Sequence, residues 1–479
     1  MSIALPADGI AVHAPSRRRT LELLLGALLW LTGIAGAFVF VEPSPYEIMG
    51  LVTIVVFAVS GLALRASLIP LSALLILYVI GFGIAVVPVL DQPKTLMWVM
   101  VSLFMAMTTL FFAAMLGTNT EERLKLLMRG YMAAAVIAAL AGIVGYFHFV
   151  PGVSGMFLLY DRARGTFNDP NVLGAFLVLP ALLAFQRVLS RRFIDAARSA
   201  LLLLLLVAGI FLSFSRGSWG AALFSTAFMM AATYFTSDNL RAKRRIVVAA
   251  VVAIAIAAIV ICVLLSIDAT REFFLQRAAL TQDYDAGETG RFGNQLRSLP
   301  LLLDRFAGFG PLRFRLVFGL EPHNSYLGAF ANDGWLGGLL FALTVGVTVW
   351  IGLRLMFKPS PYQRIAQVYF PALAAFFLQA FQIDIDHWRH VFLMLGAIWG
   401  LEAARQKWMA SGRFTSAPRS SQSASLATNA SSAPAAATIL LRPRASAGTP
   451  FAASRPTQAS RSATVISAAA SPGPVDAAP

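Results

Sequence analysis

Arginines are the first chemical signal in this 479-residue sequence, because in every second segment between the apolar runs they occur almost without lysine. Arginine grips two phosphate oxygens with a planar fork, whereas lysine acts as a hydrated point charge, so the set favours recognition of phosphate or pyrophosphate. The alternative is that these arginines pair with lipid phosphates or nearby carboxylates. The set comprises Arg162, Arg164, Arg216, Arg271, Arg277, Arg291, Arg297, Arg305, Arg313 and Arg315, with Lys94 as the exception.

Arg216 lies in a short polar stretch between two apolar runs, Ser213-Phe-Ser-Arg-Gly-Ser-Trp219. An arginine at the centre of a bilayer costs about 2.5 kcal/mol or more. Arg216 is therefore expected to face a polar cavity. The other interpretation is a turn at the membrane interface, with Trp219 as its aromatic anchor.

His323 is a candidate general base. It stands in the stretch Pro322-His-Asn-Ser-Tyr326, where a helix is predicted to begin at Asn324 or Ser325. The positive end of that helix would favour the neutral imidazole near pH 7, and neutral imidazole is a base. The alternative is a histidine that caps the helix or hydrogen-bonds a loop carbonyl.

A carboxylate pair with an adjacent histidine, Asp384-Ile-Asp386-His387, follows an apolar run near the end of the chain. Carboxylate oxygens suit magnesium, calcium or manganese. The other interpretation is a salt network with Arg389, and no metal is assigned. The sequence contains no Walker A loop, no GxSxG and no paired CxxC motif, so nucleotide hydrolysis, serine acyl transfer and structural zinc have no support.

The elements that must position these residues are long apolar runs. Apolar residues make up 58% of the chain and charged residues 13%, against roughly 25% charged in an ordinary soluble domain. Runs of about 18 residues or more are long enough to cross a hydrocarbon core of roughly 30 Å. The composition predicts an all-α polytopic membrane protein, so the net charge of +15 is no sign of a nucleic-acid partner. The single cysteine, Cys262, excludes a disulfide scaffold.

Twelve membrane spans are predicted, with charged residues, proline or glycine at their boundaries. The turns at Arg65 and Arg216 are so short that either pair of neighbouring spans could be one broken helix. The spans are 21–41, 47–65, 69–89, 95–117, 130–150, 171–189, 199–215, 217–236, 246–267, 333–356, 366–383 and 388–404.

Basic residues gather in alternate loops, which assigns a side to each loop. An even number of spans puts both ends of the chain on one side, and the positive-inside rule makes that side the cytoplasm. The first run leads into further spans, so it is predicted to be an uncleaved anchor. The cytoplasmic set is Arg17, Arg18, Arg19, Arg65, Arg123, Lys125, Arg129, Arg187, Arg191, Arg192, Arg198, Arg241, Lys243, Arg244, Arg245, Lys358 and Arg364.

The predicted organisation has three parts. Residues 1–20 form a cytoplasmic N-terminal segment, and residues 21–404 form the transmembrane domain with one large outer loop at 268–332. Residues 405–479 are rich in Ala, Ser, Thr and Pro, and cannot bury enough apolar area to offset their ordering entropy. They are predicted to be a disordered cytoplasmic tail, which serves either solubility or attraction to anionic lipid head groups.

Five motifs follow one another along the chain: Arg162-Ala-Arg-Gly-Thr-Phe-Asn-Asp-Pro-Asn171, Ser215-Arg-Gly217, Gly290-Arg291, Gly308-Phe-Gly310, and Pro322-His-Asn-Ser-Tyr-Leu327 before Gly334. In this order they resemble the O-antigen ligase and polysaccharide polymerase superfamily over roughly residues 150–400. Members are bacterial inner-membrane glycosyltransferases. They take a glycan from an undecaprenyl pyrophosphate carrier on the periplasmic side and join it to lipid A-core, another glycan or a protein.

The resemblance implies a role for particular residues. His323 matches the histidine proposed to activate the acceptor hydroxyl, and Asn171 and Asn324 lie in the same motifs. Asn294 and Gln295 depart from the pattern, because an aromatic residue often follows the Gly-Arg pair at a short distance. The residues implied to hold the pyrophosphate are Arg162, Arg164, Arg216 and Arg291.

The implied reaction agrees with the residue types. Pyrophosphate is a good leaving group, so transfer needs no ATP and does not require a metal, and no cofactor is expected. A role for Asp384 and Asp386 in metal binding is left open. Preorganised arginines can stabilise the charge that develops on the pyrophosphate. A positioned histidine contributes about 10² to 10⁴ in rate by removing the hydroxyl proton. A single displacement would invert the anomeric centre, and no residue distinguishes a ligase from a polymerase.

A transporter of a small or lipid-linked anionic solute is the alternative from another class. Transporters usually carry ionisable residues or broken helices near the middle of the membrane. In this sequence the acidic residues lie in loops or at the ends of predicted spans. That distribution favours the transferase.

Overall fold

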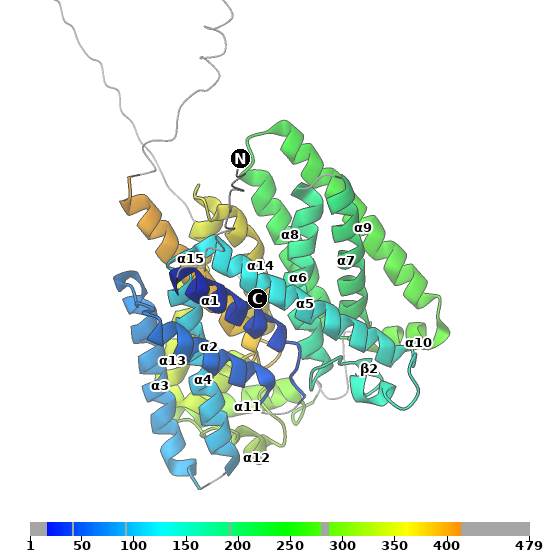
Figure 1. The fold of residues 1–479 in the computed structure, drawn as a ribbon. Helices are drawn as coiled ribbons and strands as arrows, with labels where there is room; N and C mark the ends of the chain where they lie inside the picture. Colours follow the sequence, from blue (N-terminus) through cyan, green and yellow to red (C-terminus); the bar gives the residue numbers. More distant parts are fainter. Residues whose placement is uncertain (1–16, 41–42, 92, 191–192, 279–286, 413–479) are drawn as a thin grey trace, which may run out of the picture. The chain divides into compact units, whose positions relative to one another are not determined.

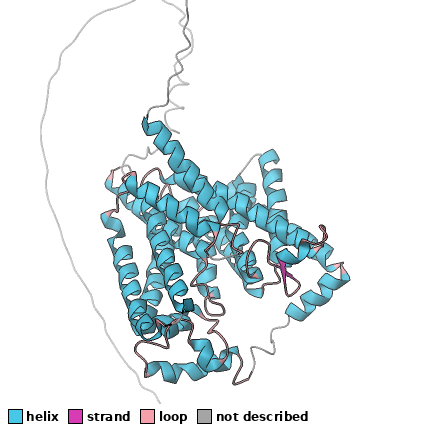
Figure 2. Ribbon diagram, turned by 60° about the horizontal axis from the view of Figure 1, so that its bottom comes forward, coloured by secondary structure: helices cyan, strands magenta, loops and turns pink. Residues whose placement is uncertain are grey.

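The computed structural model describes residues 17–40, 43–91, 93–190, 193–278 and 287–412. This part of the chain is built of helices, and a two-stranded hairpin is the one sheet within it (Figure 2). The all-α prediction is therefore confirmed for the described residues. The predicted tail from residue 413 onward and residues 1–16 of the predicted N-terminal segment lie outside them.

The helices follow one another along the chain as Figure 1 labels them. The first nine are α1 (Arg17–Ala35), α2 (Pro45–Val59), α3 (Ile69–Val86), α4 (Pro93–Met115), α5 (Thr120–Tyr146), α6 (Pro170–Ser190), α7 (Phe193–Leu212), α8 (Arg216–Phe235) and α9 (Leu240–Leu265). The others are α10 (Asp268–Ala278), α11 (Arg291–Leu303), α12 (Phe314–Phe318), α13 (Ser325–Phe357), α14 (Gln363–Gln379) and α15 (Arg389–Ala410). The hairpin pairs β1 (Leu158–Leu159) with β2 (Arg162–Ala163).

Apolar helices make this a multi-pass membrane protein. Each predicted span overlaps one helix, namely α1 to α9 and α13 to α15. Seven helices of the described chain are both long and apolar enough to cross a membrane: α3, α4, α5, α6, α7, α9 and α13. Helix α9 buries only 11% of its most apolar stretch, so most of its Val and Ile side chains face outward, as lipid contact requires.

The short turns at Arg65 and Arg216 separate distinct helices. Helix α2 ends at Val59, and a 3₁₀ turn at Ala66–Leu68 precedes α3. Helix α7 ends at Leu212, and α8 begins at Arg216 after the N-cap Ser215, whose hydroxyl accepts a hydrogen bond from the Ser218 N–H. The cap satisfies an otherwise unpaired donor of the first turn, which is why a new helix begins there.

The segment predicted as the outer loop, 268–332, holds three short helices and the start of α13. Helix α13 begins at Ser325, before the predicted span, because the Asn324 side chain accepts hydrogen bonds from the N–H groups of Tyr326 and Leu327. Gly334 then breaks the helical geometry with a φ of 69°. A Cβ there would lie 2.8 Å from the carbonyl oxygen of Phe306, so only glycine permits this close approach.

The tail does not begin at residue 405 as predicted, because α15 continues to Ala410. Arg405 is buried, and its guanidinium donates two hydrogen bonds of 2.7 Å to the Glu402 carboxylate one turn earlier. Arg354 of α13 also contacts Glu402, at 3.1 Å. This paired charge keeps the end of the helix folded against the helical bundle.

Four of the basic residues predicted to face the cytoplasm line a single groove. Lys125 and Arg129 come from α5, Arg187 from the end of α6 and Arg198 from α7, and Asp195 is the acidic residue of the groove. Residues beside two of the loops predicted to be cytoplasmic therefore lie together at one surface of the folded protein. We refer to this surface as the basic groove.

Helices α1 and α5 pack closely through two glycines. A Cβ at Gly130 would lie 2.1 Å from the carbonyl oxygen of Trp30, and one at Gly33 would lie 2.4 Å from that of Leu127. Small residues that let helix backbones approach are the usual means of association in membranes, where apolar burial supplies little drive. Gly346 of α13 differs, since nothing lies within 4 Å of a Cβ there.

Replacing Gly130 with alanine is expected to lower the stability by about 1 to 3 kcal/mol, because the new methyl group meets a main-chain atom that cannot rotate away. The matched control Gly346→Ala is expected to leave the stability unchanged or slightly higher, since alanine is the better helix former. Thermal unfolding of the two purified variants in detergent measures the difference. Equal shifts in the two variants would show that α1 and α5 do not approach as described.

Candidate active site

Arg162, in strand β2, joins the starts of two helices. Its buried guanidinium donates from Nε to the carbonyl oxygen of Ser213 at 2.9 Å, and from Nη2 to the Asn171 side-chain oxygen at 2.8 Å. Ser213 closes α7 just before α8, and Asn171 stands in the first turn of α6. Arg162 therefore fixes the hairpin against both helices.

The beginning of α8 belongs to the same cluster. The Ser218 hydroxyl is 3.2 Å from the main-chain oxygen of Asn171 and 3.0 Å from the Ser215 hydroxyl. Arg216 is the first helical residue between these serines and is partly buried. The structure thus brings Arg162, Asn171 and Arg216 together at the N-terminus of α8, where the helix dipole favours an anion.

The side chain of Arg164 forms its hydrogen bond outside this cluster. Its Nε donates to the carbonyl oxygen of Met156 at 3.2 Å, within the segment that leads into the hairpin. Its side chain is only partly buried. Strand β2 ends at Ala163, so Arg164 lies outside the strand, and the chain turns at Gly165, which has a φ of 53°.

His323 lies beside a carboxylate that sequence did not assign to it. Its Nδ1 is 3.4 Å from Asp384 Oδ2, and the other oxygen of Asp384 accepts a hydrogen bond from the Asn324 N–H at 3.1 Å. Asp384 therefore contacts the imidazole and the cap of α13 at the same time. The His323 side chain is 42% exposed, which leaves its remaining nitrogen within reach of a substrate.

The connection between α14 and α15, residues 380–388, is the segment that carries Asp384. The N–H of Ser325 donates to the Ala380 carbonyl at 2.7 Å. The Ser325 hydroxyl donates to the Ile383 carbonyl at 3.0 Å and accepts from the Ile385 N–H at 2.7 Å. Three hydrogen bonds to one serine hold this connection against the start of α13.

Arg291 reaches the same connection from α11. Its Nη1 donates to the Gln382 carbonyl at 3.1 Å. Asn294 and Gln295, the positions that depart from the family pattern, support this placement. The Gln295 side chain donates to the Pro322 carbonyl at 2.8 Å, next to His323. The Asn294 side chain donates to the carbonyl of Thr289, before α11, and to that of Phe318, at the end of α12.

Gln379 links the two clusters. It ends α14, immediately before the connection that holds Asp384, and a Cβ placed on Gly217 of α8 would lie 2.4 Å from its side-chain nitrogen. The start of α8 therefore abuts the end of α14. Through this contact the cluster of Arg162, Asn171 and Arg216 adjoins the one that contains Arg291 and His323.

Asp386 faces another histidine. Its Oδ2 is 3.2 Å from Nδ1 of His387, and His387 Nε2 is 3.0 Å from the Ser102 hydroxyl of α4. Arg389, which was a suggested partner of the Asp pair, forms an ion pair with Glu47 of α2. In the described part of the chain, no group of three or more His, Cys, Asp and Glu residues is placed to hold a metal ion.

The environment shifts the two carboxyl groups in opposite directions. Burial raises the pKa of Asp384 above its ordinary value, against the lowering effect of the His323 contact. Burial alone would also raise the pKa of Asp386, but the adjacent His387 lowers it below the ordinary value. Burial raises the pKa of Glu321, despite Arg315 at 3.5 Å. The negative charge is thus stabilised at Asp386 and disfavoured at Asp384.

The sequence analysis gave no site role to three side chains that the structure places here, those of Gln295, Ser325 and Gln379. Amide and hydroxyl side chains at the ends of apolar helices are a weak signal, because they satisfy caps and loops as often as ligands. Gln379 is the most suggestive of them. Its side-chain oxygen is buried without a hydrogen-bond partner among the described groups, so it is open to a donor from a ligand.

No protein-family model and no curated protein matches this sequence. The functional assignment therefore rests on the residues and on their arrangement.

Replacing Asp386 with asparagine is expected to cost about 1.5 to 3 kcal/mol of stability at pH 7.5, because it removes a charge that the fold stabilises. Asp384→Asn, the matched control in the same connection, is expected to cost less, since its pKa is raised and its charge is disfavoured. A carboxyl group with a lowered pKa loses its contribution to the folding free energy as the pH falls through that pKa. The difference in stability between the two variants is therefore expected to become smaller in acid. Thermal unfolding as a function of pH measures both variants; a larger loss for Asp384→Asn would contradict the assignment.

Proposed function

We propose that the protein is a glycosyltransferase that moves a glycan from undecaprenyl pyrophosphate to an acceptor hydroxyl. The observation that carries the proposal is the contact of His323 with Asp384, in a connection that also accepts a hydrogen bond from Arg291. A base held by a carboxylate next to a diphosphate-binding arginine is what this transfer needs. The acceptor is lipid A-core or a growing glycan, which makes the protein an O-antigen ligase or a polysaccharide polymerase.

The proposal includes a topology. Twelve helices cross the bacterial inner membrane, both ends of the chain lie in the cytoplasm, and the site faces the periplasm. Two observations support it: twelve helices coincide with the predicted spans, and the basic groove gathers residues from loops of the predicted cytoplasmic side. The carrier reaches the site through the surrounding membrane lipids.

Arg216 and Arg291 are the proposed diphosphate ligands. Each is the first residue of a helix, and the first turns of α8 and α11 contain no acidic residue in the described structure. A cation at a helix N-terminus is unfavourable by about 0.3 to 1 kcal/mol. A bound anion would offset that cost at both helices. Arg162 acts indirectly in this scheme, because its hydrogen bonds hold Asn171 and the carbonyl of Ser213, between α7 and α8. Arg164 is left at the edge of the site.

His323 is the proposed base. Its Nδ1 faces Asp384, so Nε2 is the nitrogen that takes the proton from the acceptor hydroxyl. The hydroxyl oxygen forms the new bond to the anomeric carbon, and the bond from that carbon to the pyrophosphate oxygen breaks. The pyrophosphate leaves with the bonding electrons and stays on its carrier. One displacement inverts the anomeric centre and uses no metal and no ATP.

A transporter is the second candidate, and one observation favours it. Asp333 lies inside α13 beside the break at Gly334, is buried, and accepts a hydrogen bond from the Tyr78 hydroxyl at 2.8 Å. The sequence placed this acid at the edge of a span, whereas the structure places it within a broken helix. Buried acids and broken helices mark substrate sites in transporters. Loss of a transferase would leave the carrier-linked donor outside the membrane, whereas loss of a transporter would leave it inside.

His323→Ala is expected to lower glycan transfer by about 10² to 10⁴, because it removes the base. His148→Ala is the matched control, since both histidines have a positive φ, 46° at His323 and 53° at His148, and the latter contacts the main chain of its own turn. Glycan attachment to the cell surface and the side on which carrier-linked donor accumulates are measured together in cells that lack the native gene.

The outcomes separate the two functions. Donor that accumulates outside the membrane in the His323→Ala cells supports the transferase, and donor that accumulates inside supports the transporter. Full transfer activity in the His323→Ala variant would show that His323 is not the base. The glycans of cells lacking the gene then identify the acceptor class, because unattached chains indicate a ligase and single repeat units indicate a polymerase.

A further inference from the structure

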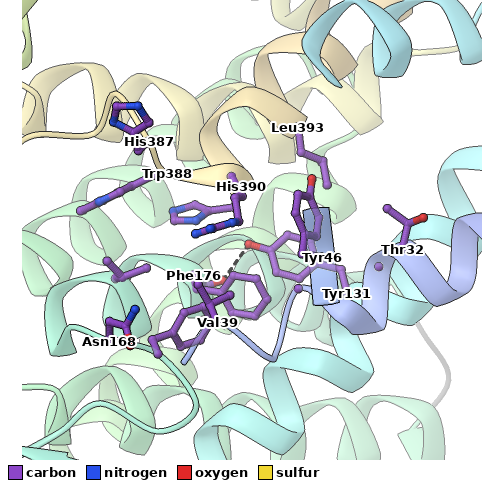
Figure 3. A pocket seen from close by; sticks show the side chains of 15 residues that line it. Thr32, Val39, Tyr46, Tyr131, Asn168, Phe176, His387, Trp388, His390 and Leu393 are labelled. Atoms are coloured by element: carbon purple, nitrogen blue, oxygen red, sulfur yellow. Dashed lines mark hydrogen bonds between the residues drawn. The ribbon is translucent and has the colours of Figure 1, made fainter. Parts of the chain in front are cut away.

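A cavity of about 180 Å³ lies between the segment after strand β2 and the start of α15 (Figure 3). Its wall is largely aromatic and includes Phe167, Phe176, Tyr131 and Trp388. Thr32 and Gly33 of α1 and Gly36, just after that helix, also line it, and α2 contributes Tyr46. We call it the aromatic cavity.

Two buried polar atoms of this wall have no hydrogen-bond partner among the described groups. They are the Tyr46 hydroxyl and the Nε2 of His390, in side chains that are each 4% exposed. An unmade hydrogen bond of this kind costs about 1 to 3 kcal/mol, so native proteins rarely keep two in one place without a reason. A ligand that forms hydrogen bonds with both atoms would explain why they are left unpaired in the fold.

The hydroxyl of Tyr131, in the same wall, has a hydrogen-bond partner. It donates to the Phe176 carbonyl at 2.9 Å, the dashed line in Figure 3. The Thr32 hydroxyl is also bonded, to Leu28 and Thr53. The two unsatisfied atoms are thus particular to Tyr46 and His390, and do not reflect a generally loose wall.

The cavity opens beside the proposed active site. Asn168, which is exposed, and His387, which is partly exposed, stand at its lining. Asn168 belongs to the segment that starts at Arg162, and His387 follows Asp384 in the connection before α15. The segments that carry the two clusters of the site therefore form opposite walls of the aromatic cavity.

The lining favours a neutral ring over water or an ion. The wall offers two unsatisfied polar atoms, the Tyr46 hydroxyl and His390 Nε2, next to several aromatic faces, to which water does not bond strongly. Arg389, the charged residue of the lining, is already paired with Glu47. Aromatic faces with a small number of directed polar groups suit a compact ring with hydroxyls at its edge.

We propose that the aromatic cavity binds one neutral sugar ring of the glycan, with its hydroxyls bonded to Tyr46 and His390. This inference rests on the proposed function, because it places the sugar beside the diphosphate ligands and the base. Recognition at this position selects which glycan is transferred. It is separate from the groups that act on the reacting atoms.

Saturation-transfer NMR on the full-length protein in lipid nanodiscs tests the proposal. The probes are methyl glycosides of common hexoses, 6-deoxyhexoses and N-acetylhexosamines. We expect saturation of at least one of them by the unsubstituted protein. Tyr46→Phe is expected to weaken that binding about tenfold while leaving the thermal midpoint equal or higher, because it removes a hydroxyl that has no partner in the fold.

Tyr131→Phe is the matched variant, since it removes a hydroxyl from the same wall that the fold does use. It is expected to lower the thermal midpoint and to weaken sugar binding less than Tyr46→Phe. The opposite pattern would overturn the proposal, as would binding that neither variant changes. Saturation of none of the probes would also overturn it and leave the cavity to water.

The transfer assay separates this inference from the proposed function. If Tyr46→Phe transfers glycan as well as the unsubstituted protein, the sugar site is wrong and the transferase stands. If sugar binds with the expected sensitivity to Tyr46→Phe but His323→Ala keeps full transfer, the sugar site stands and the assigned base is wrong.

Discussion

The carboxylate of Asp384 is the interaction on which the site depends. One oxygen faces the imidazole of His323 and the other accepts a hydrogen bond from the N–H of Asn324, so a single side chain contacts both the proposed base and the cap of the helix that follows it. Burial raises the pKa of this group, which means that the fold holds the carboxylate at a cost. Charged groups that lower the stability of the fold are typical of functional sites.

The connection between α14 and α15 extends this constraint to the rest of the domain. Helices α8, α11 and α13 all begin against it or against the end of α14, through Gly217, Arg291 and Ser325. The positive ends of these helices and their arginines add up at one place, which suits a doubly charged phosphate group. In the proposed function these helices supply a fixed electrostatic environment, and the connection between α14 and α15 holds the proposed base, His323, beside it.

Local features of this protein were predictable from the sequence, whereas contacts between distant segments were not. The apolar runs predicted the helices, and Asn324 was predicted as the start of α13, because capping and hydrophobic runs act over a few residues. The partner of His323 lies some sixty positions away, and nothing in the pattern Asp384-Ile-Asp386 indicates that its two acids face different histidines. The end of α15 was misplaced because Arg405 reads as part of a basic tail unless its pairing with Glu402 is known.

The position of a bound isoprenyl diphosphate tests the central claim most directly. A cryo-EM structure of the purified protein with this compound is expected to place the phosphates within hydrogen-bonding distance of Arg216 and Arg291, on the side of the protein where His323 meets Asp384. Phosphates bound in the basic groove of Lys125, Arg129, Arg187 and Arg198, with nothing at the start of α8, would contradict it.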